Sequence, residues 1–344
     1  LMAVSKVGGS LQYASEPLRN SKDVVLAAIK SRASAWEYVG AKFLQNSKLI
    51  RESLLEVEDD EADLGWNYVS ANVFETFPPD IKSDKNVIKH LVNGDYRIFE
   101  FIDEDLKLER EFVTQVVGSG YEASKVLRLV DKKLRDDEEI ALAAVRANGW
   151  LIDDVSERLQ KDTKITVEAL KQNGNALRDV HPSMAEDFSI VRVAVERTGI
   201  AIRFASDKFK NDKSLAMVAV KSDGIALEYV SEEMRSDPEV VFAAIDRDTQ
   251  AYRYADSTFF RDKKFALSLV GVAYGVFEDL DPSLQVDREV VLEALKLGNT
   301  DIMDYLPESL NDDEELISQI ITKLPLCVSS AIDFASNRIK NLKT

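Results

Sequence analysis

The sequence predicts an all-α protein, an α-solenoid of about twelve short helical-hairpin repeats with a period of 25 residues. Three observations predict this fold class. Aspartates recur at the period, apolar residues recur at fixed offsets after each aspartate, and a glycine follows the first apolar set in several repeats. The aspartates that begin the regular repeats are Asp137, Asp162, Asp187, Asp212, Asp237, Asp262 and Asp287.

The first element of each repeat is a predicted helix that begins after the aspartate. Its carboxylate can accept a hydrogen bond from a free backbone N–H, and its charge favours the positive end of the helix dipole. A glycine after about eleven helical residues can adopt the left-handed conformation that ends a helix. These glycines are Gly149, Gly174, Gly199 and Gly224, and later repeats have Thr249, Tyr274 and Asn299 instead.

Apolar residues three, seven and eight positions after the aspartate fall on one face of this helix. The middle position is mostly alanine, which lets neighbouring helices approach closely. Its residues are Ala144, Ala169, Ala194, Ala219, Ala244, Leu269 and Ala294.

A second apolar set predicts a shorter helix of about two turns and then a capped turn that leads to the next aspartate. Its first members are Ile152, Leu177, Ile202, Leu227, Tyr252 and Phe277. Such a hairpin cannot bury its apolar face alone, whereas stacked neighbours can. We therefore expect residues 1–344 to form a single continuous α-solenoid.

The repeat continues beyond the strict period in both directions. Upstream, Asp84 and Glu109 begin repeats, and Ser21 and Ser47 begin two more at looser intervals. Downstream, the apolar pattern shifts by one residue, so that a late repeat begins at Asp313. The chain also starts with apolar residues typical of a helix interior. We expect it to be a fragment of a longer chain.

Two interruptions stand out, and insertions in a solenoid commonly lie on one exposed face. The first is an acidic insertion at residues 56–65. It lacks the carboxylate spacing of an EF-hand loop, so we expect a solvated loop, with a bound cation or basic peptide as the alternative. The second is a short excess around residues 122–132, where we expect an extended second helix.

Two segments carry a resemblance to a known family. They are "NGWLIDDVSERLQKDTKITVEALKQNG" at residues 148–174 and "SDGIALEYVSEEMRSDPEVVFAAI" at residues 222–245. Both resemble the repeat called domain of unknown function 4116, and the likeness extends over nearly the entire chain and is loosest at residues 59–79, where a longer connection interrupts the period. The resemblance implies a tandem helical array and no shared activity, because proteins with such repeats have no common catalytic residues.

Composition narrows the classes of partner. With 61 acidic and 44 basic residues the formal net charge is −17, which argues against binding to nucleic acid or to anionic membrane surfaces and favours a basic or neutral protein. The longest charge-free stretch, residues 267–277, is too short to span a membrane. A single cysteine, Cys327, excludes an internal disulfide and suits an intracellular reducing compartment, an organelle included.

The sequence also lacks the patterns of an enzyme. His90 and His181 lie far apart in the repeat scheme, and His181 occupies a turn or cap position. A histidine metal site or a catalytic triad is therefore not expected. Neither is a phosphate-binding glycine loop, so we predict no catalytic residue, no metal and no cofactor.

Candidate partner-binding residues are those that depart from the apolar template. Phe204, Tyr229 and Tyr254 share one position in three successive repeats, which predicts a row of aromatic side chains on one surface strip. The alternative is that this position is half-buried between neighbouring helices. Phe260 and Trp150 are further candidates.

The leading hypothesis is a non-catalytic protein–protein interaction scaffold or linker subunit of a larger, multi-subunit assembly. One alternative is a bacterial effector or viral protein that binds a host protein. Another is a regulatory repeat module attached to an enzymatic region outside this fragment.

Overall fold

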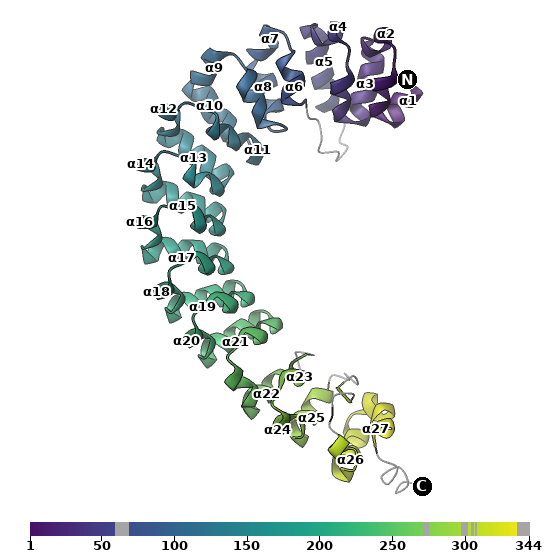
Figure 1. Cartoon of the computed structure of the whole chain (residues 1–344), viewed down its shortest axis with the longest axis vertical. Coiled ribbons are helices and arrows are strands. Elements are labelled where there is room, and N and C mark those ends of the chain that lie inside the picture. The colour runs from purple at the N-terminus through teal and green to yellow at the C-terminus, as the bar shows by residue number, and fades with distance from the viewer. Residues whose placement is uncertain (59–68, 271–274, 297–301, 304–305, 307, 336–344) are drawn as a thin grey trace. The chain divides into compact units, whose positions relative to one another are not determined.

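A computed structural model of the chain describes residues 1–58, 69–270, 275–296, 302–303, 306 and 308–335 (Figure 1). Every regular element in these ranges is a helix, which confirms the predicted all-α class. By its contacts the chain divides into two compact units, Leu1–Arg197 and Thr198–Thr344, and we describe each by itself.

The first unit contains α-helices and 3₁₀ helices in alternation. Its α-helices are α1 (Met2–Lys6), α2 (Glu16–Arg19), α3 (Lys22–Ser31), α4 (Ala41–Leu44), α5 (Ser47–Glu58), α6 (Ala71–Glu75), α7 (Pro79–Lys82), α8 (Lys85–Leu91), α9 (Glu104–Leu108), α10 (Arg110–Val117), α11 (Tyr121–Ser124), α12 (Lys132–Arg135), α13 (Glu138–Ala147), α14 (Glu157–Gln160), α15 (Thr163–Gln172), α16 (Pro182–Ala185) and α17 (Phe188–Arg197). Its 3₁₀ helices are η1 (Gly8–Tyr13), η2 (Ala33–Tyr38), η3 (Tyr96–Phe101), η4 (Lys125–Arg128), η5 (Gly149–Asp153) and η6 (Gly174–Asp179).

The second unit repeats the same succession of elements. Its α-helices are α18 (Asp207–Lys210), α19 (Lys213–Ser222), α20 (Glu232–Arg235), α21 (Pro238–Arg247), α22 (Lys263–Leu269), α23 (Val276–Asp279), α24 (Pro282–Gln285), α25 (Arg288–Leu295), α26 (Glu314–Lys323) and α27 (Val328–Phe334). Its 3₁₀ helices are η7 (Gly199–Phe204), η8 (Gly224–Tyr229), η9 (Thr249–Tyr254), η10 (Ser257–Arg261), η12 (Glu308–Leu310) and η13 (Pro325–Cys327).

A regular repeat thus has three elements, as in α19, η8 and α20: a ten-residue α-helix, a six-residue 3₁₀ helix and a four-residue α-helix. The sequence predicts the first element correctly. The second is a 3₁₀ helix, and the predicted capped turn is a helical turn of its own. A 3₁₀ helix rises about 2.0 Å per residue against about 1.5 Å in an α-helix, so six residues can run back along most of a ten-residue helix.

The aspartate caps are confirmed. Asp237, for example, accepts hydrogen bonds from the Glu239 and Val240 amides at 2.9 and 3.3 Å. The same kind of bond is made by Asp84, Asp137, Asp162, Asp187, Asp212, Asp262, Asp287 and Asp313.

One predicted repeat start is wrong. Ser47 is the first residue of α5, and the capping side chain is Asn46, whose Oδ1 accepts from the Leu49 amide at 3.1 Å. Asn46 lies 25 residues after Ser21, so the period holds strictly at this place. The looser interval in the prediction arose because serine is an equally common cap residue.

The predicted role of the glycines is also wrong. The long helices end on an extended residue, such as Asp223 with φ −148°, and the glycine begins the following 3₁₀ helix. A Cβ atom on Gly224 would lie 2.5 Å from the Ala244 carbonyl oxygen in the next repeat. The same holds at three other glycines, where a Cβ atom would lie 2.4 Å from a carbonyl oxygen of the next repeat. The pairs are Gly8 with Ala28, Gly149 with Ala169 and Gly199 with Ala219. Close approach between repeats requires these glycines, not a left-handed backbone.

The alanine face is buried as predicted. Ala144, Ala169, Ala219 and Ala244 are all 0% exposed, and successive long helices pack on one another within each unit, α13 on α15 and α19 on α21. Alanine carries no side chain beyond Cβ, so the helix axes can approach and the row of buried aliphatic residues beside it becomes a continuous core.

Backbone hydrogen bonds join the short helices of successive repeats. The amide of Ser231 donates to the Lys210 carbonyl at 3.0 Å, and that of Asp256 to Arg235 at 3.0 Å. Equivalent bonds in the first unit are Gly40 to Arg19, Asp103 to Lys82 and Ser156 to Arg135. Orphan carbonyls at the end of a short helix are thereby satisfied by the neighbouring repeat.

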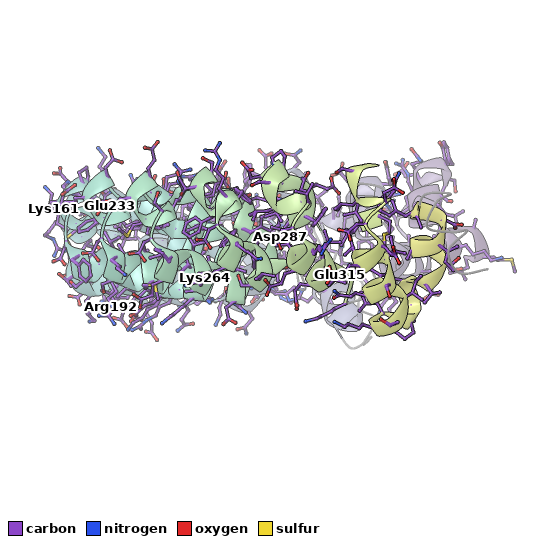
Figure 2. The ribbon with its side chains drawn as sticks, turned by 90° about the horizontal axis from the view of Figure 1, so that it is seen from below. Lys161, Arg192, Glu233, Lys264, Asp287 and Glu315 are labelled. Carbon is purple, nitrogen blue, oxygen red and sulfur yellow. The ribbon has the colours of Figure 1, made fainter. Side chains whose placement is uncertain are left out.

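Ion pairs join the starts of successive long helices. Lys213 contacts both Asp237 and Glu239 of the next repeat at 2.8 Å. Lys263 contacts Asp287 and Glu289 in the same way, at 2.8 and 2.9 Å. Arg288 pairs with Asp313 and Glu315, and Arg110 with Asp137 and Glu139 in the first unit. We call these contacts the ion-pair row; Asp287 and Glu315 from it are labelled in Figure 2.

The two predicted interruptions have different outcomes. Helix α5 continues to Glu58, and the rest of the acidic insertion at 56–65 lies outside the described residues. The extended second helix near residue 122 is confirmed, because α11 and η4 run without a break from Tyr121 to Arg128.

Candidate interaction surface

Three predicted site residues lie together in the second unit. Phe204, Tyr229 and Tyr254 are the last residues of η7, η8 and η9, and these 3₁₀ helices pack on one another in order. All three side chains are half-buried. We call these residues the aromatic strip. The packed 3₁₀ helices place the three residues in one row, their half-burial fits the second interpretation, and their partner-binding role stays a prediction.

Charged side chains flank the aromatic strip. Arg203 lies with its guanidinium carbon 4.5 Å from the centre of the Phe204 ring, a cation–π geometry. A hydrogen bond with Glu228, helped by burial, raises the pKa of the Tyr229 hydroxyl. Arg203 also reaches that hydroxyl, so charges of both signs meet at one tyrosine.

Trp150 lies in the first unit, at the second residue of η5. Its ring is half-buried, and the Arg178 guanidinium carbon lies 4.7 Å above it. In this part of the chain the position of the aromatic strip is held by Asp154 and Asp179, which pair with Arg128 at 2.7 Å and Arg178 at 2.9 Å. Burial and these two neighbouring carboxylates raise the pKa of Asp153.

Three further aromatic residues occupy the same position, and sequence reasoning missed them. Tyr13, Tyr38 and Phe101 end η1, η2 and η3, and Tyr13 is 85% exposed. Two of them, Tyr13 and Tyr38, are 25 residues apart, which was the available signal. The non-aromatic residues of the intervening repeats hid the recurrence.

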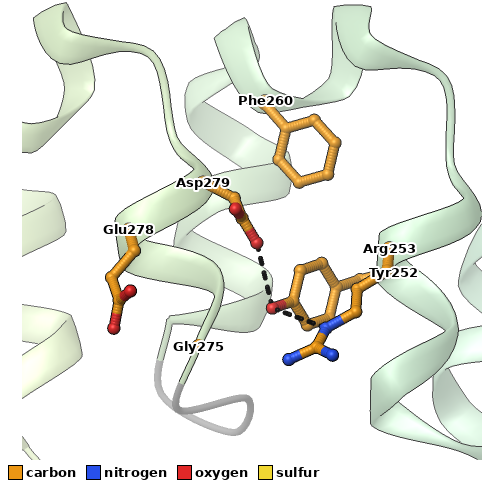
Figure 3. A pocket seen from close by; sticks show the side chains of 6 residues that line it. All are labelled: Tyr252, Arg253, Phe260, Gly275, Glu278 and Asp279. Carbon is orange, nitrogen blue, oxygen red and sulfur yellow. Dashed lines mark hydrogen bonds between the residues drawn. The ribbon is translucent and has the colours of Figure 1, made fainter.

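Phe260 does not end a repeat's 3₁₀ helix and belongs to a different feature, an open pocket of about 570 Å³ (Figure 3). It is half-buried on η10, and its ring meets those of Tyr252 and Phe265 edge-on at 6.2 and 5.9 Å. The pocket is lined by Tyr252, Arg253, Phe260, Gly275, Glu278 and Asp279.

The Tyr252 hydroxyl is the polar centre of this pocket, although the residue as a whole is 0% exposed. It donates a hydrogen bond to Asp279 Oδ2 at 3.1 Å and accepts one from Arg253 Nε at 3.5 Å, as the dashed lines in Figure 3 show. Burial raises the pKa of this hydroxyl, so it stays protonated at neutral pH.

A second pocket, of about 480 Å³, surrounds Asp95 in the first unit. Its carboxylate accepts from Arg97 Nε and Nη2 at 2.8 and 2.9 Å and from the Ala71 amide at 3.0 Å. Burial acts to raise the pKa of Asp95, but these hydrogen bonds outweigh it and hold the pKa below its usual range. All the partners are internal, so Asp95 fastens η3 to α6.

The described residues contain no group of three or more His, Cys, Asp or Glu side chains that could hold a metal ion. His181 caps α16, its Nδ1 accepting from the Ser183 amide at 3.2 Å, as its predicted cap position requires.

No single helix among the described residues is long and apolar enough to cross a membrane. One pair, α26 with residues Pro325–Phe334, reaches that length and composition only when joined, and it is bent by 117°.

Comparison with known proteins gives one match. The family described as Domain of unknown function (DUF4116) matches residues 1–44, 137–184, 187–235 and 213–261. No curated protein and no solved structure matches the chain. The matched segments share the period of the aspartate caps and contain the three-element repeat described above. The chain therefore resembles tandem repeats of the DUF4116 family.

Proposed function

We propose that the chain is a non-catalytic protein–protein interaction scaffold or linker subunit of a larger assembly, and that it binds a protein through the aromatic strip. The observation that carries the proposal is the recurrence of half-exposed aromatic rings at one position of three consecutive, mutually packed 3₁₀ helices.

Physical reasoning supports a recognition role for this arrangement. The buried positions of a repeat are needed to build the stack, so a partner can distinguish repeats only by side chains that reach the surface. Tyrosine and arginine are enriched at the energetic centres of protein interfaces, because they bury a large area and keep a polar tip. Phe204, Tyr229 and Arg203 supply these side chains on adjacent elements.

Charge supports a protein partner over a nucleic acid. The formal net charge of −17 repels phosphate backbones, while Arg203 and Glu228 give the strip itself both signs of charge. A basic or neutral protein that presents apolar side chains suits this surface.

Site-specific photo-crosslinking tests the proposal. A photoreactive phenylalanine analogue replaces Tyr229 in the full chain, and a second variant carries it at Glu232, an exposed position on α20 whose side chain is 94% accessible. We expect one protein to crosslink at position 229 and not at position 232.

Measuring the affinity of alanine variants for the crosslinked protein tests the contribution of the tyrosines. The variant Tyr229→Ala with Tyr254→Ala should lose affinity for that protein by roughly 30-fold or more, since a single interface anchor of about 2 kcal/mol already corresponds to that factor. Glu232→Ala should leave affinity unchanged. Equal crosslinking at both positions, or full affinity in the folded double variant, would overturn the proposal.

A further inference from the structure

We propose that the pocket around Tyr252 binds a free α-amino acid with an apolar side chain, its carboxylate on Arg253 and its ammonium group on Asp279. This site is separate from the aromatic strip, and the inference does not depend on the proposed function.

The pocket exists because two positions depart together from the repeat template. Position 252 is aliphatic in the four preceding repeats, as Ile152, Leu177, Ile202 and Leu227, and only Tyr252 brings a hydroxyl to it. One repeat later, position 275 is glycine, whereas its equivalents are Trp150, Asn175, Ile200, Ile225 and Gln250. A Cβ atom on Gly275 would lie 2.9 Å from the Tyr252 hydroxyl oxygen, so the missing side chain makes the room that this hydroxyl needs.

A third position supplies the charge, and it is also an aspartate in the first unit, at Asp154 and Asp179. The position of Asp279 is aromatic in the three preceding repeats, in Phe204, Tyr229 and Tyr254, and is a carboxylate here. Asp279 and Arg253 each reach the Tyr252 hydroxyl, yet among the described residues they form no ion pair with each other. The Tyr252 hydroxyl therefore lies between the guanidinium and the carboxylate and contacts both, so the two charged groups face the same pocket (Figure 3).

An amino-acid head group matches a pocket lined by one guanidinium and one carboxylate. Its carboxylate can accept two parallel hydrogen bonds from a guanidinium, and its ammonium group, one carbon away, can donate to a carboxylate. Glu278 lines the same pocket and adds a second negative charge on the side of Asp279. The lining therefore has one positive and one negative side chain on the Tyr252 hydroxyl, and Glu278 as a further negative side chain that points away from it (Figure 3).

The rest of the pocket favours an apolar side chain. The Phe260 ring forms a wall over Tyr252, and Gly275 exposes only backbone opposite. A volume of about 570 Å³ lies within the range of small-molecule sites. Burying an aliphatic or aromatic side chain against Phe260 would add to the two polar contacts.

Equilibrium dialysis of the full chain with radiolabelled L-phenylalanine and L-leucine tests the inference. We expect saturable binding of one molecule per chain, with a dissociation constant on the order of 0.1–1 mM for a ligand of this size in an open site. Arg253→Gln and Asp279→Asn should each weaken binding about tenfold or more, as expected for loss of a charged hydrogen bond. Arg261→Gln, an exposed arginine of the same unit that does not line the pocket, is the matched control and should bind normally.

Capped ligands on the unmodified chain test the same contacts without any risk of misfolding. N-acetyl-L-phenylalanine lacks the ammonium group and L-phenylalanine amide lacks the carboxylate, so each should bind at least about tenfold more weakly than the free amino acid. Absence of saturable binding up to about 10 mM, or capped ligands that bind as tightly as free L-phenylalanine, would overturn the inference. Neither result bears on crosslinking at Tyr229, so the two proposals fail separately.

Discussion

Replacing Gly224 by alanine tests the structural reason for the glycine repeat. The added Cβ would lie 2.5 Å from the Ala244 carbonyl oxygen and 2.7 Å from the Asp248 Cβ, whereas Cβ contacts under 3.0 Å essentially never occur. The neighbouring repeat must therefore move by at least half an ångström against its own packed backbone. Overpacking of this kind costs roughly 1–3 kcal/mol of unfolding free energy.

Gly9→Ala is the matched control. Gly9 also lies in a 3₁₀ helix that follows a helix end, but a Cβ there meets nothing within 4 Å. Its unfolding free energy should stay the same or rise by about 0.4–1 kcal/mol, because alanine restricts the unfolded chain. Urea denaturation followed by circular dichroism compares the two variants, and hydrogen exchange should place the loss of protection at η8 and α21.

A third variant separates the two explanations for glycine. If a left-handed backbone were the reason, Gly224→Asn would be milder than Gly224→Ala, since asparagine tolerates that conformation. If close approach is the reason, asparagine is worse than alanine, because its side chain is larger. Equal stability of Gly224→Ala and Gly9→Ala would refute the close-approach explanation.

Three further predictions concern the core, the caps and the cysteine. Ala244→Leu should lower the unfolding free energy by roughly 1–3 kcal/mol, while Ala243→Leu, one residue away and half-buried, should cost less; urea denaturation compares them. A hydrogen bond from Lys213 holds the pKa of Asp237 below its usual range. This carboxylate therefore stabilises the fold at pH values above its unfolded pKa of about 3.9. The stabilisation is lost as the pH falls through the lower pKa of the folded state. Asp237→Asn should therefore flatten the loss of unfolding free energy below about pH 4, which urea denaturation at a series of pH values measures. Cys327 is 0% exposed and burial raises the pKa of its thiol, so a thiol reagent should modify it only as urea opens the last repeats, and fast labelling in buffer would contradict the packing.

The elements that sequence predicts best are those whose chemistry is local. An aspartate cap and an alanine seven residues later specify a helix start and a packing face within one repeat, so Asp237 and Ala244 were both predicted correctly. Asn46 was missed because an adjacent serine is an equally plausible cap. The 3₁₀ form of the second helix was missed because two turns of apolar periodicity do not distinguish i+3 from i+4 spacing.

Features that depend on contacts between two repeats could not be predicted from the sequence pattern of a single repeat. The glycines looked like helix terminators because the Ala244 oxygen that excludes a side chain at Gly224 comes from the following repeat. The pocket likewise needs Tyr252 and Gly275 together, and neither residue alone indicates a cavity. The aromatic strip could be predicted, since its members share one position and the stacking brings equal positions together.

The ion-pair row also constrains how this array can change in length. Lys213 pairs with two acidic residues of the following repeat, the capping residue Asp237 and Glu239 two residues after it. Deleting the single repeat 237–261 would place Asp262 and Lys264 there instead, and two lysines would face each other. Deleting 237–286 would bring up Asp287 and Glu289, which restore both pairs. At this step of the array, loss of one repeat therefore removes an ion pair that loss of two repeats would restore.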